Sequence, residues 1–131
     1  MSSETLHEDP ATLGPDVIDQ HRAIVSLMEE LEAVDWYNQR AKATTNPELR
    51  AILEHNRDEE KEHAAMVLEW LRRGDAKLAG HLRTYLFTEA PVTEIEAVVE
   101  HGGQEPAPTS DGRNCDGSLG IGSLRPVTSG G

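Results

Sequence analysis

The sequence predicts an all-α protein built on an antiparallel pair of long helices. Apolar residues recur at helical spacing along two long segments, and no segment shows the period-two alternation of a half-buried strand. A break containing proline separates the two segments, so the chain can turn back on itself there. All five aromatic residues precede residue 90, whereas eight of the eleven glycines follow residue 101. The folded part therefore ends before the glycine-rich C-terminal segment begins.

Helix signals define the two long elements. The first helix is expected over residues 15–43, because proline suits the first turn of a helix. The break after it ends in Asn46-Pro47, which is an N-cap residue followed by a proline at the first helical position. The second helix is expected over residues 47–73, with two arginines in its last turn and Gly74 as its stop.

Shorter helices and a polar end complete the expected organisation. A third helix is predicted over residues 76–87, and one or two helical turns over residues 92–99. The Gly/Ser/Pro-rich end cannot offset its ordering entropy by burial. We therefore expect a helical domain at residues 1–97, a flexible linker at 98–115 and a separate tail at 116–131.

Composition excludes several classes of function. The 131 residues include 24 Asp and Glu against 12 Lys and Arg, which gives a formal net charge of −12. Such a charge argues against binding to nucleic acids or to anionic membrane surfaces. No apolar run reaches the ~18 residues of a spanning helix, and the N-terminus lacks the pattern of a signal peptide. A single cysteine, Cys115, cannot staple a fold, so we expect a cytoplasmic protein.

The strongest chemical signal is a set of ionisable residues on the apolar faces of the two long helices. Glu60 lies in the middle of the apolar stripe of the second helix, and His63 follows it at i+3. Glu30 lies between Leu27 and Val34 on the stripe of the first helix. An unpaired buried carboxylate costs several kcal/mol or becomes protonated. A cation resolves this for all three groups, and this donor set suits iron, manganese or zinc better than copper(I).

This ligand set is half of a known arrangement. Ferritin-like bundles use a lone Glu from each of two helices and a Glu-x-x-His motif from each of the other two. The chain supplies Glu30 once and Glu60-Lys-Glu-His63 once, so a second copy related by a two-fold axis would supply the rest. The apolar content of 37% is also thin for a self-sufficient core. Both observations predict a dimer.

Simpler explanations remain open for each of these residues. An isolated Glu-x-x-His motif also arises by chance on a solvated helix. Glu29 and Glu32 project away from the apolar stripe, as expected of a solvated face. His55, Glu59 and Glu62 can be either ordinary surface charges or a weak cation site. Trp36 and Tyr37 can pack either in the core or at an interface.

Three segments closely resemble one protein family. They are MEELEAVDWY at residues 28–37, HNRDEEKEH at 55–63 and LEWLRR at 68–73. They are similar to the encapsulated ferritins, prokaryotic ferritin-like proteins packaged inside encapsulin nanocompartments. The resemblance covers about residues 5–97. It implies a two-helix hairpin with a short terminal helix, two chains forming a four-helix bundle around a di-iron ferroxidase centre, and five such dimers in a ring.

The resemblance also implies roles for individual residues. The positions that match the iron ligands are Glu30, Glu60 and His63, and those that match aromatics beside the centre are Trp36 and Tyr37. Acidic residues of a proposed iron entry point between subunits match Glu29 and Glu32. A peripheral cation site, open to other divalent cations, matches His55, Glu59 and Glu62.

The C-terminal segment DGSLGIGSLR at residues 116–125 resembles the targeting peptide of encapsulin cargo. Leu119, Ile121 and Leu124 are isolated apolar anchors in a glycine-rich stretch that can extend into a groove. A featureless linker is the alternative. Residues 127–131 follow this segment and leave the end of the docking region open.

The resemblance predicts an enzyme, a ferroxidase that oxidises Fe(II) to Fe(III) with O₂. It would act in iron storage and detoxification as cargo of an encapsulin shell in the prokaryotic cytoplasm. One alternative is a non-catalytic acidic helical adaptor. Another is a rubrerythrin-like scavenger of oxygen or peroxide, although the sequence has no Cys-x-x-Cys pair for a rubredoxin iron.

Overall fold

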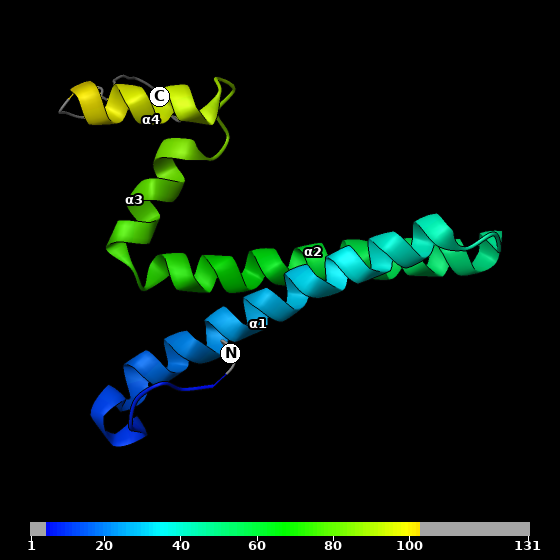
Figure 1. The fold of residues 1–131 in the computed structure, drawn as a ribbon, viewed down its shortest axis with the longest axis horizontal. Helices are drawn as coiled ribbons and strands as arrows, with labels where there is room; N and C mark the ends of the chain where they lie inside the picture. Colours follow the sequence, from blue (N-terminus) through cyan, green and yellow to red (C-terminus); the bar gives the residue numbers. More distant parts are fainter. Residues whose placement is uncertain (1–4, 103–131) are drawn as a thin grey trace, which may run out of the picture. The chain divides into compact units, whose positions relative to one another are not determined.

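The computed structural model describes residues 5–102, which contain helices and no strand (Figure 1). The helices are α1 (Pro10–Ala43), α2 (Pro47–Arg73), α3 (Ala76–Tyr85) and α4 (Val92–Gly102). The predicted all-α class is therefore confirmed, and α2 has the predicted boundaries. The chain divides into two compact units, with the boundary between Leu82 and Arg83, so α1 and α2 lie together in the first unit.

The start of α1 differs from the expectation because a second helix signal lies further upstream. The Asp9 carboxylate accepts a hydrogen bond of 3.0 Å from the Ala11 amide, and Pro10 occupies the first helical position. Gly14 has a φ of +81°, which a residue with a side chain rarely adopts, and it kinks the helix before Pro15. The long regular part of α1 therefore begins at Pro15, as predicted, and the short helical stretch before Gly14 was not predicted.

The two shorter helices also end at other residues than expected. Helix α3 stops at Tyr85, and the Tyr85 carbonyl accepts a hydrogen bond of 2.7 Å from the Thr88 hydroxyl. Phe87, which was predicted to be helical, has a φ of +61° that no helix allows. Helix α4 continues to Gly102, three residues beyond the predicted Val99.

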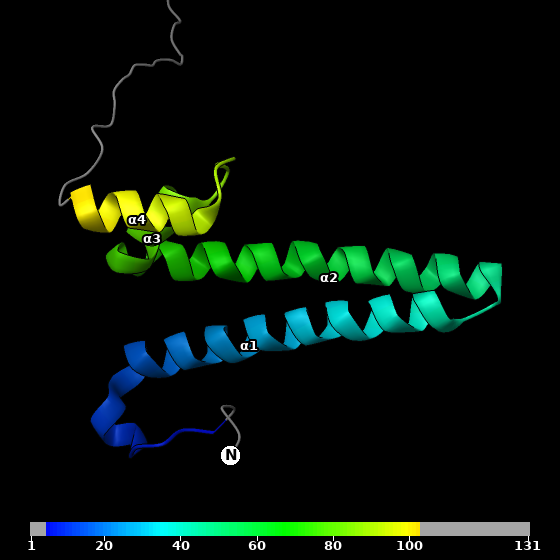
Figure 2. The same ribbon diagram turned by 45° about the horizontal axis from the view of Figure 1, so that its top comes forward.

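Helices α1 and α2 form the predicted antiparallel hairpin (Figure 2). Asn46 caps α2 by accepting a hydrogen bond of 2.9 Å from the Leu49 amide. Arg50 closes the turn, because its Nε donates to the Ala41 carbonyl at 3.0 Å and its Nη2 donates to the Thr44 carbonyl. These bonds satisfy carbonyls at the C-terminal end of α1 that have no partner within the helix.

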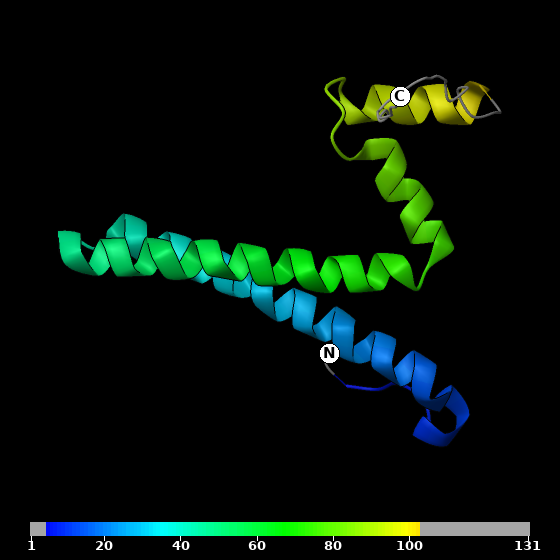
Figure 3. The same ribbon diagram turned by 180° about the vertical axis from the view of Figure 1, so that it is seen from behind.

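A single copy of the hairpin has almost no core. Among the described residues the only buried apolar side chains are Ala41 (3% exposed) and Ala64 (7%), and no large side chain is fully buried. Helices α1 and α2 lie against each other along one side of each helix, so within the hairpin the opposite side of each has no partner (Figure 3). The exposed large apolar side chains on α1 and α2 are Val17, Ile24, Met28, Leu31, Trp36, Leu49, Ile52, Met66 and Trp70.

None of the helices within residues 5–102 combines the length and the apolar character needed to cross a membrane.

Candidate metal centre

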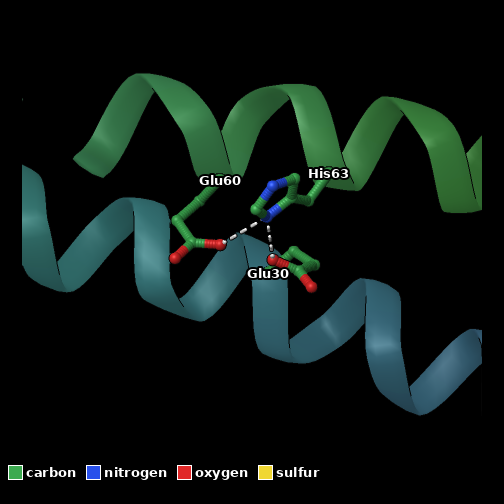
Figure 4. Close-up of side chains that lie close together, drawn as sticks. All are labelled: Glu30, Glu60 and His63. Carbon is green, nitrogen blue, oxygen red and sulfur yellow. Dashed lines mark hydrogen bonds and ion pairs between the residues drawn. The ribbon is translucent and has the colours of Figure 1, made fainter. Parts of the chain in front are cut away.

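The hairpin brings together the three residues predicted to bind metal. Glu30 comes from the middle of α1, while Glu60 and His63 come from adjacent turns of α2 (Figure 4). Their i, i+3 spacing places Glu60 and His63 on the same side of α2. Since the two helices are antiparallel, this side meets the side of α1 that carries Glu30.

The three side chains lie within reach of one ion. The Nδ1 atom of His63 is 3.2 Å from Oε1 of Glu60 and 3.5 Å from Oε1 of Glu30. One ligand atom from each residue lies within 4.8 Å of the other two. The Glu30 and Glu60 side chains are 26% and 24% exposed, and that of His63 is 49% exposed. Within residues 5–102 this is the only group of three or more Asp, Glu, His or Cys residues with such geometry.

The close approach of like charges changes the proton affinity of the group. A hydrogen bond with Glu60 raises the pKa of Glu30, and partial burial raises it further. The same bond lowers the pKa of Glu60, so Glu30 has the higher proton affinity of the two carboxyls. The hydrogen bond with Glu60 also raises the pKa of His63. The raised pKa values of Glu30 and His63 mean that the group takes up protons more readily, and a bound proton, like a bound cation, offsets negative charge on the two neighbouring carboxylates.

Two carboxylates and one imidazole suit a first-row metal ion with preference for oxygen and nitrogen, such as iron, manganese or zinc. One chain offers only three such residues, and the half-exposed His63 leaves the group open on one side. A metal ion here would complete its coordination with solvent or with groups from another chain.

Metal binding at this group is expected to weaken as the pH falls. A metal takes the neutral imidazole and the ionised carboxylate, whereas the raised pKa values of His63 and Glu30 keep their protons bound to a higher pH. Lowering the pH through these pKa values therefore strengthens the competing protons. Anaerobic calorimetry with Mn(II) in buffers of different ionisation enthalpy measures this effect. We expect lower affinity at about pH 6 than at about pH 8, with proton release on binding. Binding that releases no protons would contradict the assignment.

Trp36 and Tyr37, both on α1, share one cationic neighbour. The guanidinium carbon of Arg40 lies 5.9 Å from the centre of the Trp36 ring and 5.6 Å from that of the Tyr37 ring. Such distances allow cation–π attraction. Arg40 was not among the residues predicted from the sequence, although its i+4 and i+3 spacing from Trp36 and Tyr37 indicates that the three side chains lie on one side of α1.

The other predicted metal-binding residues do not form a comparable group in one chain. His55 Nε2 and Glu59 Oε2 form an ion pair of 2.9 Å, and Glu62 is not part of that pair. Glu29 and Glu32 are exposed on α1. Their roles in a peripheral site and at an entry point remain predictions. The three apolar residues of the predicted docking segment lie outside the described residues: Leu119, Ile121 and Leu124.

Comparison with known proteins identifies relatives along most of the chain. The family model described as EncFtn-like matches residues 5–89. The encapsulated ferritin-like protein of Rhodospirillum rubrum is 62% identical over 127 residues, which are 95% of this chain and 91% of the relative. The ferritin-like protein of Thermotoga maritima is 50% identical over 119 residues, which are 91% of this chain and 96% of the relative.

More distant and structural matches agree. The encapsulin nanocompartment cargo protein EncC of Myxococcus xanthus is 34% identical over 104 residues, covering 77% of this chain and 80% of the relative. The crystal structure of a protein from Nitrosomonas europaea matches with a TM-score of 0.65 and 57% identity, over 66% of this chain and 96% of that one. The chain therefore belongs to the EncFtn-like family, the encapsulated ferritins.

Proposed function

We propose that this protein is a ferroxidase, in which two copies combine their Glu30, Glu60 and His63 groups into a di-iron centre. The observation that carries the proposal is the convergence of these three side chains, which form half of a ferritin-like ligand set. Iron is the substrate, and it binds as Fe(II) and is oxidised to Fe(III) by O₂. Each Fe(II) gives up one electron, and O₂ accepts the electrons together with protons.

The protein groups contribute binding and electrostatic stabilisation. Iron displaces the protons from Glu30 and His63, so that two carboxylates per chain face the metal pair in ionised form. Carboxylate oxygens hold both oxidation states, and their negative charge favours the more positive product, Fe(III). The His63 imidazole completes the coordination. Trp36 and Tyr37 are proposed to lie next to the centre.

A dimer also solves the packing problem of the hairpin. Nine large apolar side chains of α1 and α2 are exposed in one copy, and a four-helix bundle would bury many of them. Membership of the family supports a further step, a ring of five such dimers. Such a ring has no closed cavity, so iron storage would depend on a surrounding shell.

The cargo role follows from the relatives and from the C-terminal segment. Two Myxococcus xanthus relatives are named encapsulin nanocompartment cargo proteins. We propose that residues 116–131 dock this chain on an encapsulin shell, and that the stretch between the end of α4 at Gly102 and residue 116 is the tether. The protein would then act inside an encapsulin compartment in the prokaryotic cytoplasm, in iron storage or detoxification.

Two further cation sites belong to the same proposal. Glu29 and Glu32 are exposed carboxylates on α1 and would attract Fe(II) to an entry point between subunits. His55, Glu59 and Glu62 would form a weaker peripheral site that also takes other divalent cations; the His55–Glu59 pair supports it.

Native mass spectrometry with anaerobically added Fe(II) tests assembly and metal content together. We expect an even number of chains, with two irons per pair of chains, because each chain supplies half of the ligands. A non-catalytic adaptor would carry no stoichiometric iron, and that result would overturn the proposal. The number of Fe(II) ions oxidised per O₂ consumed then separates a ferroxidase from a scavenger of oxygen or peroxide.

A further inference from the structure

The closed end of the hairpin carries a hollow whose charge is opposite to that of the chain. The hollow has a volume of about 380 Å³ and lies between the end of α1 and the first half of α2, and its lining residues do not include Glu30, Glu60 or His63. Its charged lining residues are Lys42, Arg50, Arg57 and Glu54. Three of the four are cationic, although acidic residues outnumber basic ones two to one in the whole sequence. If the charged residues were distributed at random, the lining of the hollow would be expected to carry a net negative charge.

Both arginines are held in place by the protein and keep free donors. Arg50 uses Nε and Nη2 to bind the carbonyls of Ala41 and Thr44, which leaves Nη1 available. Arg57 donates from Nε to Asp58 at 2.9 Å and from Nη1 to the Asn38 side chain at 3.1 Å, which leaves Nη2 available. The seven-residue spacing places both arginines on the same side of α2.

Lys42 faces the same hollow from α1. Its ammonium group has no ion pair or hydrogen bond within residues 5–102, and neither does the carboxylate of Glu54. Three positive charges and one negative charge therefore line the hollow. Asp58, which forms an ion pair of 2.9 Å with Arg57, adds a second negative charge beside the hollow, so the unbalanced charge is about that of a dihydrogen phosphate monoanion. A bound anion would relieve the remaining repulsion among the three cations.

We propose that this hollow binds a tetrahedral oxyanion, with inorganic phosphate as the ligand. Guanidinium groups offer planar N–H donors that match phosphate oxygens, and an ammonium group adds a mobile point charge. Because the arginines are already anchored, little side-chain entropy is lost when the anion binds. The site is separate from Glu30, Glu60 and His63, so the inference does not depend on the proposed ferroxidase activity.

Calorimetric titration of the full-length protein with sodium phosphate, in a chloride buffer without added iron, tests the proposal. We expect saturable binding of one phosphate per chain. Lys42→Gln removes one charge without breaking any contact within the described residues, and we expect it to weaken binding about tenfold, the effect of one charge-assisted hydrogen bond. Lys77→Gln, which removes the same charge from α3 outside the hollow, is the matched control and should leave binding unchanged.

Three results would overturn the proposal. Phosphate that fails to saturate, or that sulfate and chloride displace equally well, is an adventitious ion only. Equal weakening in Lys42→Gln and Lys77→Gln would show a general charge effect. A change in subunit number in Lys42→Gln, measured by native mass spectrometry without phosphate, would show that an acidic group of another copy occupies the hollow. The Glu60→Ala variant should keep its phosphate binding, so failure of the metal centre and failure of this site are distinguishable.

Discussion

Replacing Glu30, Glu60 or His63 by alanine is expected to abolish iron-dependent oxidation and stoichiometric iron binding. Each substitution removes one ligand from a group whose ligand atoms lie within 4.8 Å of one another. In the proposed dimer each substitution removes two ligands, because the shared centre loses the same ligand from both copies. Changes to residues that only support metal ligands typically cost about 10–100-fold in metal affinity. Loss of a ligand on both sides should therefore cost about a hundredfold or more.

The measurements are the rate of Fe(II) oxidation, followed by absorbance of the Fe(III) product, and the iron retained after gel filtration. Glu60→Gln keeps the shape of the side chain and removes its charge, so it should fail as Glu60→Ala does. Glu48→Gln is a matched control, since it removes the same charge from an exposed position in the first turn of α2. Helicity by circular dichroism checks that each variant folds. Unchanged activity in all three alanine variants would refute the site.

Much of this site could be predicted from the sequence because it depends on local spacing. The i, i+3 relation of Glu60 and His63 holds in any regular helix. Their meeting with Glu30 needed one further inference, that the break at Asn46-Pro47 makes the two helices antiparallel. The structure confirms the hairpin, with Asn46 as the cap of α2. The raised pKa of Glu30 was not predictable, because it depends on interatomic distances across two helices.

Features that depend on contacts between elements were missed for the same reason. Arg50 lies on the polar side of its helix in sequence, yet its guanidinium binds carbonyls of Ala41 and Thr44 across the turn. Only the turn geometry reveals that contact. The short helical stretch before Gly14 was missed, because Asp9 and Pro10 start it upstream of the predicted helix and a kink at Gly14 joins it to that helix. The thin core, in contrast, followed from composition alone, and the only buried apolar side chains that the structure describes in residues 5–102 are those of two alanines.

Deleting residues 116–131 is expected to stop co-purification with a co-expressed encapsulin shell while leaving iron oxidation per chain unchanged. The proposed docking segment offers three apolar anchors, Leu119, Ile121 and Leu124, spaced by glycine and serine. Burial of one such side chain contributes about 1.5–3 kcal/mol. Loss of conformational entropy on docking would offset part of that gain, so one tail alone is expected to bind weakly. Several tails on one assembly would bind together with far higher avidity.

Packaging is therefore expected to be separable from both metal binding and folding. Leu119→Ala, Ile121→Ala and Leu124→Ala combined should lose packaging as the deletion does, since the anchors supply the apolar area. Deleting only residues 127–131 is the matched control and should retain the protein in the shell, because the three anchors remain. Packaging is measured by gel analysis of shells purified by size, and oxidation by the same assay as above. Continued packaging of the 116–131 deletion would show that docking does not depend on this tail and would overturn the proposed role of the three anchors.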